Sequence, residues 1–417
     1  MTASLGERLR AHTVWLDRDD VDLLTVAGSE GWLWERDHVG FAGRGTALRI
    51  DLPRGLAGGA ADDVAEILGT IEPGDDIGVP GSGPVAVGAL PFDRTAPASL
   101  VVPSTIVGRT ADGRCWPTSV GPAEPAELEL PDAMAPQDPD GFALTSPVPH
   151  EEWMALVGRA VRAIEDGRFG KVVLAREVRV DTNRPIHVPT VLRRLRSLYP
   201  ACTVLSAPAP GGGRFLAASP ELLVSRTGSV VESHPLAGTI PRSGDPAADQ
   251  ALADGLLGSE KDRAEHDWVV RDVERALAPW CSVLEVPDTP SIVSFRNVSH
   301  LGTRIHGRLG DRSRPTALAL AAALHPTAAV GGTPRDAALA WLEANERLDR
   351  GPYAGPVGWV DANGDGEWVV GIRSAVVDGT IARLFAGVGV VDGSDPASEL
   401  AETQFKLQAL LAAVVRP

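Results

Sequence analysis

Three side chains near the C-terminus have the types and spacing to bind a metal ion and an acid. Glu399, Glu402 and Lys406 follow Asp395-Pro396, in which Asp is a favoured N-cap and Pro a favoured first helical residue. The pattern predicts a helix that begins there and carries both carboxylates and the ammonium on one face. A carboxylate pair beside a cation suits a metal ion that itself holds an acid. The simpler alternative is a solvated face with an ion pair.

A candidate base and a candidate acid come earlier in the chain. Lys171 stands directly before the apolar run 172–175. An ammonium among apolar side chains loses hydration, which disfavours its charged form, so Lys171 could act as a general base. Glu221 follows Ser219-Pro220 and leads into an apolar strand, where burial would raise the pKa of its carboxyl and keep it protonated, as a general acid requires. The alternatives are a lysine that snorkels from a strand end and a glutamate at the surface or in a cap.

A long helix predicted over about residues 245–278, with a break near Gly258, carries two more carboxylates. Asp262 and Glu265 share one of its faces. An inward carboxylate face can bind Mg²⁺, although charged helix faces are usually solvated. Just before this helix, Gly238 and Thr239 lie in a predicted loop whose N–H groups could face a ligand oxygen; a plain turn is the alternative.

Three further patterns predict no site. Residues 361–366 match the opening of a calcium loop, but its twelfth position is Ile372 rather than Glu, so we expect a hairpin turn. Gly387 and Gly389 do not complete a dinucleotide-binding motif. His300 and His325 have no second histidine at metal-ligand spacing.

The elements that would position these residues are strands and helices in irregular alternation. A helix is predicted over 151–166, and a meander of strands over 355–391 precedes the final helix. Within the meander, 367–373 and 383–389 are predicted as strands joined by a turn at Asp378-Gly379. Antiparallel strands and long helices without regular βαβ units indicate an α+β fold.

The composition excludes several classes of protein. The 417 residues are 44% apolar and carry a formal net charge of −16 without a basic stretch, which argues against nucleic-acid and anionic-membrane partners. Cys115, Cys202 and Cys281 suggest neither a disulfide framework nor a zinc site. The first residues lack an apolar signal region, and the longest apolar run, 317–324, is too short to span a bilayer. We therefore expect a soluble cytoplasmic protein.

In their order along the chain, nine blocks resemble the chorismate-utilising family, which comprises anthranilate, aminodeoxychorismate, isochorismate and salicylate synthases. They cover about the last 260 residues and are 170–176, 219–223, 235–239, 260–266, 325–330, 355–359, 367–373, 383–389 and 399–407. The resemblance implies the α+β fold of aminodeoxychorismate (ADC) synthase, with two packed antiparallel β-sheets and helices on the outside. Residues 1–120 would be the mostly β N-terminal part, 121–145 a Pro-rich acidic connection, and 146–417 the catalytic region.

Two positions distinguish the subfamilies. A lysine at the position of Lys171 activates water in isochorismate and salicylate synthases, and anthranilate synthases lack it. Aminodeoxychorismate synthases carry a nucleophilic lysine where this chain has Ala237. The resemblance therefore implies an isochorismate synthase, in which Lys171 takes a proton from water attacking C2 of chorismate and Glu221 protonates the departing C4 hydroxyl.

The resemblance also implies the rest of the site. Mg²⁺ would be held by Glu265 and Glu402, supported by Asp262 and Glu399, and would bind the ring carboxylate. The other substrate-binding residues would be Arg373, Lys406, Gly238, Thr239, Ala329 and Gly387. Chorismate would be the small-molecule partner of a monomer, and the product would enter menaquinone or siderophore biosynthesis.

Other functions remain open at this point. A salicylate synthase, which forms isochorismate and then eliminates pyruvate, would use the same catalytic residues. A non-catalytic chorismate-binding protein would have no use for an acid and a base on opposite faces of the ring. Anthranilate synthesis is a remote third alternative.

Overall fold

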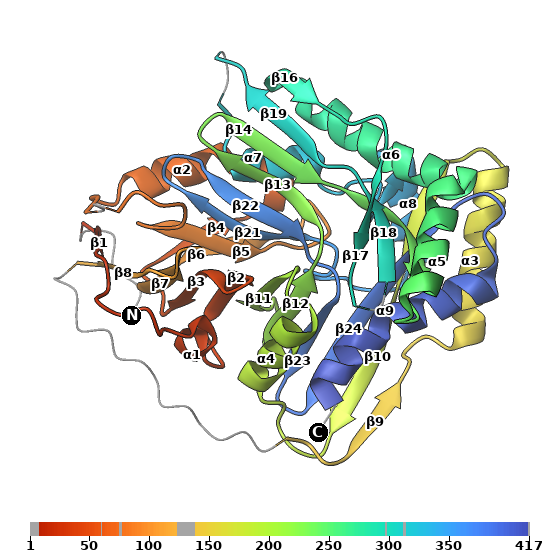
Figure 1. Cartoon of the computed structure of the whole chain (residues 1–417), viewed down its shortest axis with the longest axis horizontal. Coiled ribbons are helices and arrows are strands. Elements are labelled where there is room, and N and C mark those ends of the chain that lie inside the picture. The colour runs from red at the N-terminus through yellow and green to blue at the C-terminus, as the bar shows by residue number, and fades with distance from the viewer. Residues whose placement is uncertain are drawn as a thin grey trace.

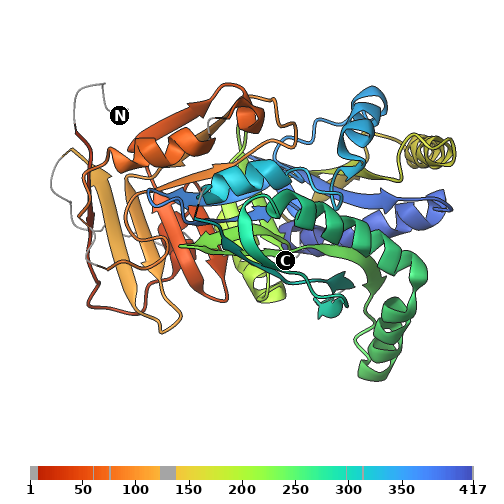
Figure 2. The same cartoon turned by 90° about the horizontal axis from the view of Figure 1, so that it is seen from above.

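The computed structural model describes residues 8–59, 61–74, 77–122, 138–296, 298–311 and 314–415. Two large antiparallel sheets form its centre, and helices lie on their outer faces (Figures 1 and 2). The predicted α+β fold with two packed antiparallel sheets is confirmed. A small third sheet lies beside them, which the sequence did not predict.

The larger sheet has twelve strands in the described part of the chain. Its order is β1 (Arg10–Thr13), β8 (Cys115–Gly121), β7 (Thr105–Arg109), β3 (Val39–Arg44), β2 (Trp32–Arg36), β11 (Thr203–Pro208), β12 (Arg214–Ser219), β23 (Ser374–Asp378), β24 (Ile381–Val390), β10 (Lys171–Thr182) and β20 (Gly332–Thr333), and β9 (Phe142–Thr145) also pairs with β10. Residues 123–137 of the predicted connection lie outside the described residues.

The second sheet has nine strands and the third has three. The nine are β16 (Cys281–Glu285), β19 (Ile305–Leu309), β14 (Val230–His234), β13 (Leu222–Thr227), β22 (Gly366–Val370), β21 (Pro356–Asp361), β5 (Val85–Ala89), β6 (Ala98–Val102) and β4 (Leu48–Leu52). The three are β15 (Leu236–Pro241), β18 (Val298–Gly302) and β17 (Ser291–Ser294). N-terminal strands pair with later ones in both large sheets, β2 with β11 and β5 with β21, so the N-terminal part shares the core of the catalytic region.

The helices predicted over 151–166, over about 245–278 and after Asp395-Pro396 are present close to these limits, and the structure contains others that were not predicted. The described helices are α1 (Leu23–Ala27), α2 (Ala61–Gly69), α3 (His150–Glu165), α4 (Val188–Leu198), α5 (Pro246–Gly258), α6 (Glu260–Leu277), α7 (Ala317–Leu324), α8 (Arg335–Asn345) and α9 (Pro396–Val415), with a short 3₁₀ turn at Gly55–Gly58. The predicted break near Gly258 separates α5 from α6, where Ser259 caps α6 by accepting from the Asp262 N–H. Among the described residues, none of the helices is both long and apolar enough to cross a membrane.

Apolar side chains fill the space between the two large sheets. Phe41 of the twelve-stranded sheet meets Trp359 of the nine-stranded sheet edge to face, with ring centroids 5.8 Å apart. Separate apolar clusters lie outside, where α6 and α7 cover the nine-stranded sheet and α4 and α9 cover the twelve-stranded one. This packing sets β10, β24, α6 and α9 around one cavity.

One strand prediction is wrong. Residues 367–373 were expected to pair across a turn with 383–389, but β22 belongs to the nine-stranded sheet and β24 to the twelve-stranded one. The chain crosses between the sheets at residues 371–373, and Arg373 takes a left-handed φ of 50° there. The turn at Asp378-Gly379 instead joins β23 to β24. Strand-like residues do not reveal which sheet a strand joins, because both sheets bury the same apolar side chains.

Candidate active site

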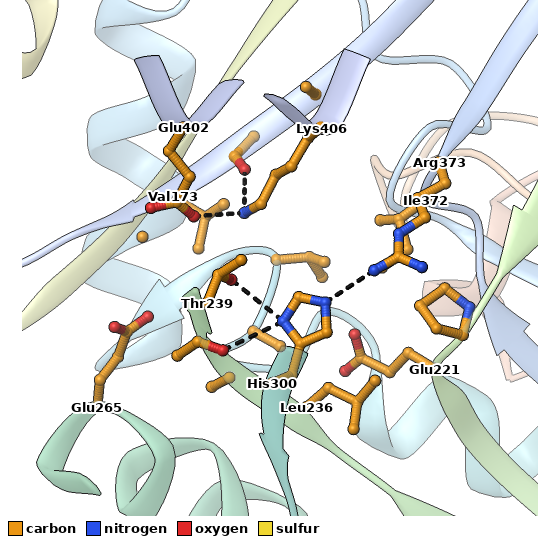
Figure 3. A pocket seen from close by; sticks show the side chains of 18 of the residues that line it. Val173, Glu221, Leu236, Thr239, Glu265, His300, Ile372, Arg373, Glu402 and Lys406 are labelled. Atoms are coloured by element: carbon orange, nitrogen blue, oxygen red, sulfur yellow. Dashed lines mark hydrogen bonds and ion pairs between the residues drawn. The ribbon is translucent and has the colours of Figure 1, made fainter. Parts of the chain in front are cut away.

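All twelve predicted site residues line one cavity of about 160 Å³. It lies where β10 and β24, the small third sheet, α6 and α9 meet (Figures 1 and 3). The residues are Lys171, Glu221, Gly238, Thr239, Asp262, Glu265, Ala329, Arg373, Gly387, Glu399, Glu402 and Lys406. Segments up to 235 positions apart in the chain therefore converge here, and the roles of these residues remain predictions.

Lys171 is buried and paired with a carboxylate. Its side chain is 1% exposed, and its Nζ lies 2.9 Å from Oε1 of Glu265, one turn into α6. Burial alone would raise the pKa of Glu265, but Lys171, Lys406 and Lys261 together outweigh it and the net shift is downward. The expectation of purely apolar neighbours for Lys171 is therefore wrong, because Glu265, 94 positions later, places a carboxylate beside the amine and favours its charged form.

Gly389 leaves the space that this ion pair occupies. A Cβ at this position of β24 would lie 2.6 Å from Glu265 Oε1 and 2.7 Å from Lys171 Cε. We expect Gly389→Ala to displace both side chains and to lower kcat at least about tenfold, since small misplacements of reacting groups are costly. Gly255→Ala is a matched control, because a Cβ there meets nothing within 4 Å. Steady-state kinetics checks the prediction, and an unchanged kcat for Gly389→Ala would contradict it.

Glu221 lies directly before β13 and is 4% exposed. Burial raises the pKa of its carboxyl to about 7, although a backbone hydrogen bond and the cations Lys171, Lys406 and Arg373 act in the opposite direction. The structure shows the predicted burial of this carboxyl at the start of an apolar strand, and this burial raises its pKa. In the view of Figure 3, Glu221 and Glu265 lie on opposite sides of the cavity, with Thr239 and His300 between them.

His300 connects one wall of the cavity to Arg373. Burial and the Arg373 charge hold the pKa of this histidine well below its ordinary value, so the ring is neutral. Arg373 Nη2 lies 2.8 Å from His300 Nε2, which must accept because a guanidinium only donates. Nδ1 therefore carries the proton and donates to Gly238 O and Thr239 Oγ1, each 3.1 Å away. Figure 3 shows this chain of contacts.

Arg373 is a half-buried cation without a carboxylate partner among the described residues. Its guanidinium contacts His300 and the sulfur of Cys202, and it stacks over the Phe295 ring at 4.6 Å. Burial lowers the pKa of Arg373, but a guanidinium stays charged at any physiological pH. It therefore has free donors for an anionic ligand.

Lys406 joins α9 to β24. Its Nζ lies 2.7 Å from Glu402 Oε1 and donates to Gly387 O at 2.9 Å (Figure 3). The carbonyl of Gly387, like that of Gly238, is thus already bound by a site side chain. Gly238 has a φ of 71°, which favours glycine. It also lies within strand β15, so the loop predicted over residues 234–239 is wrong. The strand was missed because, within the described ranges, its one partner is β18, more than fifty residues later.

The donor set on one side of the cavity fits a divalent cation. Asp262, Glu265, Glu399 and Glu402 offer oxygen ligands there, the type that Mg²⁺ prefers. Glu265 and Glu402 are each paired with a lysine. The two ammonium groups therefore neutralise the carboxylates that a divalent ion would otherwise neutralise. In the described part of the chain no three such groups already stand at metal-binding distances. A metal would therefore draw the carboxylates away from their lysines.

Three polar residues of the site were missed in the sequence. His300 was considered only as a metal ligand, and Tyr353, which stacks on Phe385 with ring centroids 5.2 Å apart, was not singled out. Lys261 at the start of α6 is the third. A signal for Lys261 was present, because 36 of the 39 lysine and arginine residues are arginine and the three lysines all line this cavity.

The dismissed calcium pattern is a hairpin turn, as predicted. Asp361 Oδ1 accepts from the backbone N–H groups of Asn363 and Asp365 at 2.8 and 2.9 Å, between β21 and β22. Its carboxylate is thus used within the turn.

Comparison with known proteins places these observations in a family. The sequence profile described as chorismate binding enzyme matches residues 125–415. The chain is 42% identical to isochorismate synthase DhbC of Bacillus subtilis over 340 residues, 80% of this chain and 81% of that protein. It is 35% identical to isochorismate synthase EntC of Escherichia coli over 333 residues, 79% of this chain and 80% of that protein.

Solved structures agree. A Bacillus anthracis protein described as a 2,3-dihydroxybenzoate-specific isochorismate synthase is 34% identical, with a TM-score of 0.80 over 94% of this chain and 98% of its own. The menaquinone-specific isochorismate synthase of Escherichia coli has the same fold, with a TM-score of 0.83 at 24% identity over 98% and 95% of the two chains. Together with the cavity that collects the predicted residues, these similarities show that the chain belongs to the chorismate-binding enzymes.

Proposed function

We propose that this enzyme is an isochorismate synthase, an isomerase that converts chorismate to isochorismate. The observation that carries the proposal is the pair of buried groups at one cavity, Lys171 and a Glu221 carboxyl whose pKa is raised to about 7. Glu265, the ion-pair partner of Lys171, lies across the cavity from Glu221 (Figure 3). A base and an acid on opposite sides suit addition of water to one face of a ring and loss of hydroxide from the other.

The residues divide the reaction between them. Lys171 takes a proton as water forms its bond to C2, the ring double bonds shift, and the C4–oxygen bond breaks. Glu221 gives its proton to the departing hydroxyl, so that water leaves and the elemental composition of the substrate is conserved. Arg373 and Lys406 bind the negative groups of chorismate, and the backbone around Gly238, Thr239, Ala329 and Gly387 completes the contacts.

A bound Mg²⁺ would compensate the substrate carboxylate and orient it. We propose Glu265 and Glu402 as its protein ligands, with Asp262 and Glu399 supporting them. Local cations of this kind explain how a dianion can enter a chain with a net charge of −16.

EDTA should abolish turnover, and added Mg²⁺ should restore it, because the carboxylate side of the cavity needs a counter-ion when chorismate is bound. Titration calorimetry should show weaker Mg²⁺ binding by Glu265→Gln and Glu402→Gln. Glu274→Gln, exposed on the same α6 helix, is the control that should bind as the wild type does. Metal-independent turnover would remove Glu265 and Glu402 from this role.

Product analysis tests the proposal against its alternatives. The purified enzyme is incubated with chorismate and Mg²⁺, with and without ammonium, and the products are separated by chromatography. Isochorismate as the accumulating product supports the proposal. Salicylate with pyruvate would identify a salicylate synthase, anthranilate formed only with ammonium would identify an anthranilate synthase, and binding without product would identify a non-catalytic protein.

We further propose a monomeric cytoplasmic enzyme. Every group assigned above comes from one chain, and Cys115, Cys202 and Cys281 are free thiols, as in a reducing compartment. Its product would feed a menaquinone or a siderophore pathway, since one similar protein is named menaquinone-specific and another vibriobactin-specific.

A further inference from the structure

One edge of strand β10 lacks a strand partner over its middle. On the edge opposite β24, β10 pairs with β20 at Lys171 and Val172, and with β9 from Arg179 onward. Between these two pairings, residues 173–178 have no strand beside them in the described part of the chain. This gap begins two residues after Lys171, so whatever fixes the edge there also fixes the proposed base.

Side chains from the segment that follows α8 bind the main chain in this gap. Glu346 Oε2 accepts from the Ala175 N–H at 2.8 Å, and Arg350 Nη2 donates to the Val173 carbonyl at 2.7 Å. Arg350 Nη1 also donates to the carbonyl of Val330 at 3.0 Å. Val173 and Val330 both line the active-site cavity, beside Lys171 and Ala329 respectively. Glu346 and Arg350 therefore bind the main chain of two segments that line the active-site cavity.

Glu346 and Arg350 also bind each other. Arg350 Nε lies 2.6 Å from Glu346 Oε1 and Arg350 Nη2 lies 2.9 Å from Oε2, with the two side chains 3% and 6% exposed. A buried ion pair is costly to desolvate and is weak evidence for stability by itself. Its value here lies in geometry, because the bidentate contact fixes the orientation of both groups toward β10.

Apolar side chains of α3 and α8 pack against Val172 and Leu174 of β10. Two cavities of about 510 and 520 Å³ flank the segment, and Glu346, Leu348 and Asp349 line both of them. The Arg350 guanidinium stacks on Phe92 at 4.2 Å, which fixes one of its faces. The Glu346–Arg350 pair therefore fixes the edge of β10 together with this packing and with Trp153, whose Nε1 donates to the Ala175 carbonyl at 3.1 Å.

We propose that Glu346 and Arg350 are positioning residues for the reaction: the pair stands in for the missing strand and sets the place of Lys171 through Val173 and Ala175. This inference rests on the proposed function, in which Lys171 is the base. Neither residue lines the active-site cavity. Their loss should therefore impair the chemical step more than substrate binding, which depends on Arg373 and Lys406.

The test compares Glu346→Ala, Glu346→Gln and Arg350→Lys with Glu343→Gln. Glu343 is exposed on the same helix and has no hydrogen bond or ion pair with a described residue. We expect kcat to fall about 100-fold for Glu346→Ala and Arg350→Lys, since displacement by about 1 Å costs that much. Glu346→Gln should be intermediate, because it keeps an oxygen for the Ala175 N–H. KM for chorismate should stay within about threefold, and Glu343→Gln should match the wild type.

Hydrogen–deuterium exchange by mass spectrometry supplies a readout independent of turnover. Peptides covering β10 should exchange faster in Glu346→Ala while those covering the nine-stranded sheet stay protected. A kcat within threefold of wild type in the folded variants, or a rise in KM at constant kcat, would overturn the positioning role. If Glu346→Ala does not fold, the kcat and KM of Glu346→Gln and Arg350→Lys test the positioning role. A wild type that forms no isochorismate defeats the proposed function, whereas the exchange data still test whether the pair holds β10.

Discussion

Lys171→Ala should abolish measurable turnover of chorismate while the protein stays folded. General base catalysis raises the rate about 10²- to 10⁴-fold, and the variant lacks the amine that is paired with Glu265 and acts as the base. Some stability will be lost, because Glu265 is left without its ion-pair partner. Since Glu265 is 17% exposed, the loss should be below the roughly 3–5 kcal/mol found for fully buried pairs.

Steady-state kinetics and thermal unfolding in the presence of Mg²⁺ check this result together. Arg179→Ala is the matched control, since Arg179 lies on the same strand, is exposed and forms an ion pair with Asp181 away from the cavity. It should keep wild-type kcat. If Lys171→Ala retained most of the activity, a different group would have to activate the water and the assignment of the base would be wrong.

Glu221→Gln should likewise remove turnover, since the amide cannot protonate the departing hydroxyl. In the wild type, burial raises the pKa of Glu221 to about 7, and activity requires the protonated form. The rate should therefore decline as the pH rises above about 7. A pH profile of kcat/KM for the wild type measures this limb, and a profile flat between pH 6 and 9 would argue against Glu221 as the acid.

The same substitution has a second, opposite effect on stability. The pKa of Glu221 is higher in the folded state than its ordinary 4.5, so its contribution to stability is fully present below 4.5 and is lost as the pH rises through about 7. The difference corresponds to roughly 3 kcal/mol at alkaline pH. Glu221→Gln should therefore unfold at a higher temperature than the wild type at pH 8.5 but not at pH 5. A stability difference that does not change with pH would contradict burial as the cause.

The sequence was sufficient for the parts of the site that depend on local pattern. Glu399, Glu402 and Lys406 share a helix face by spacing alone, and Lys171 and Glu221 stand at strand entries that apolar runs define. The order of the nine blocks then implied the family and its fold, which the comparisons bear out.

What could not be predicted depends on pairings across the chain. The contact of Lys171 with Glu265, and the chain from Arg373 through His300 to Gly238, join residues from different sheets and helices. Spacing within one element says nothing about such partners. The wrong pairing of β22 has the same origin, because its residues would fit either sheet and the crossover depends on the left-handed backbone at Arg373.

All three lysines of this enzyme line one cavity, so amine-reactive reagents can modify it selectively there. Acylating reagents such as activated esters attack unprotonated primary amines and leave guanidinium groups intact, so apart from the chain's α-amino group they have targets only at the catalytic cavity. The exposed Lys261 would be modified before Lys171, whose side chain is 1% exposed. Coupling to an amine-reactive resin would thus attach the molecule either through its α-amino group or at Lys261 of the catalytic cavity, and electrophilic analogues of the substrate would find no competing lysine elsewhere in the sequence.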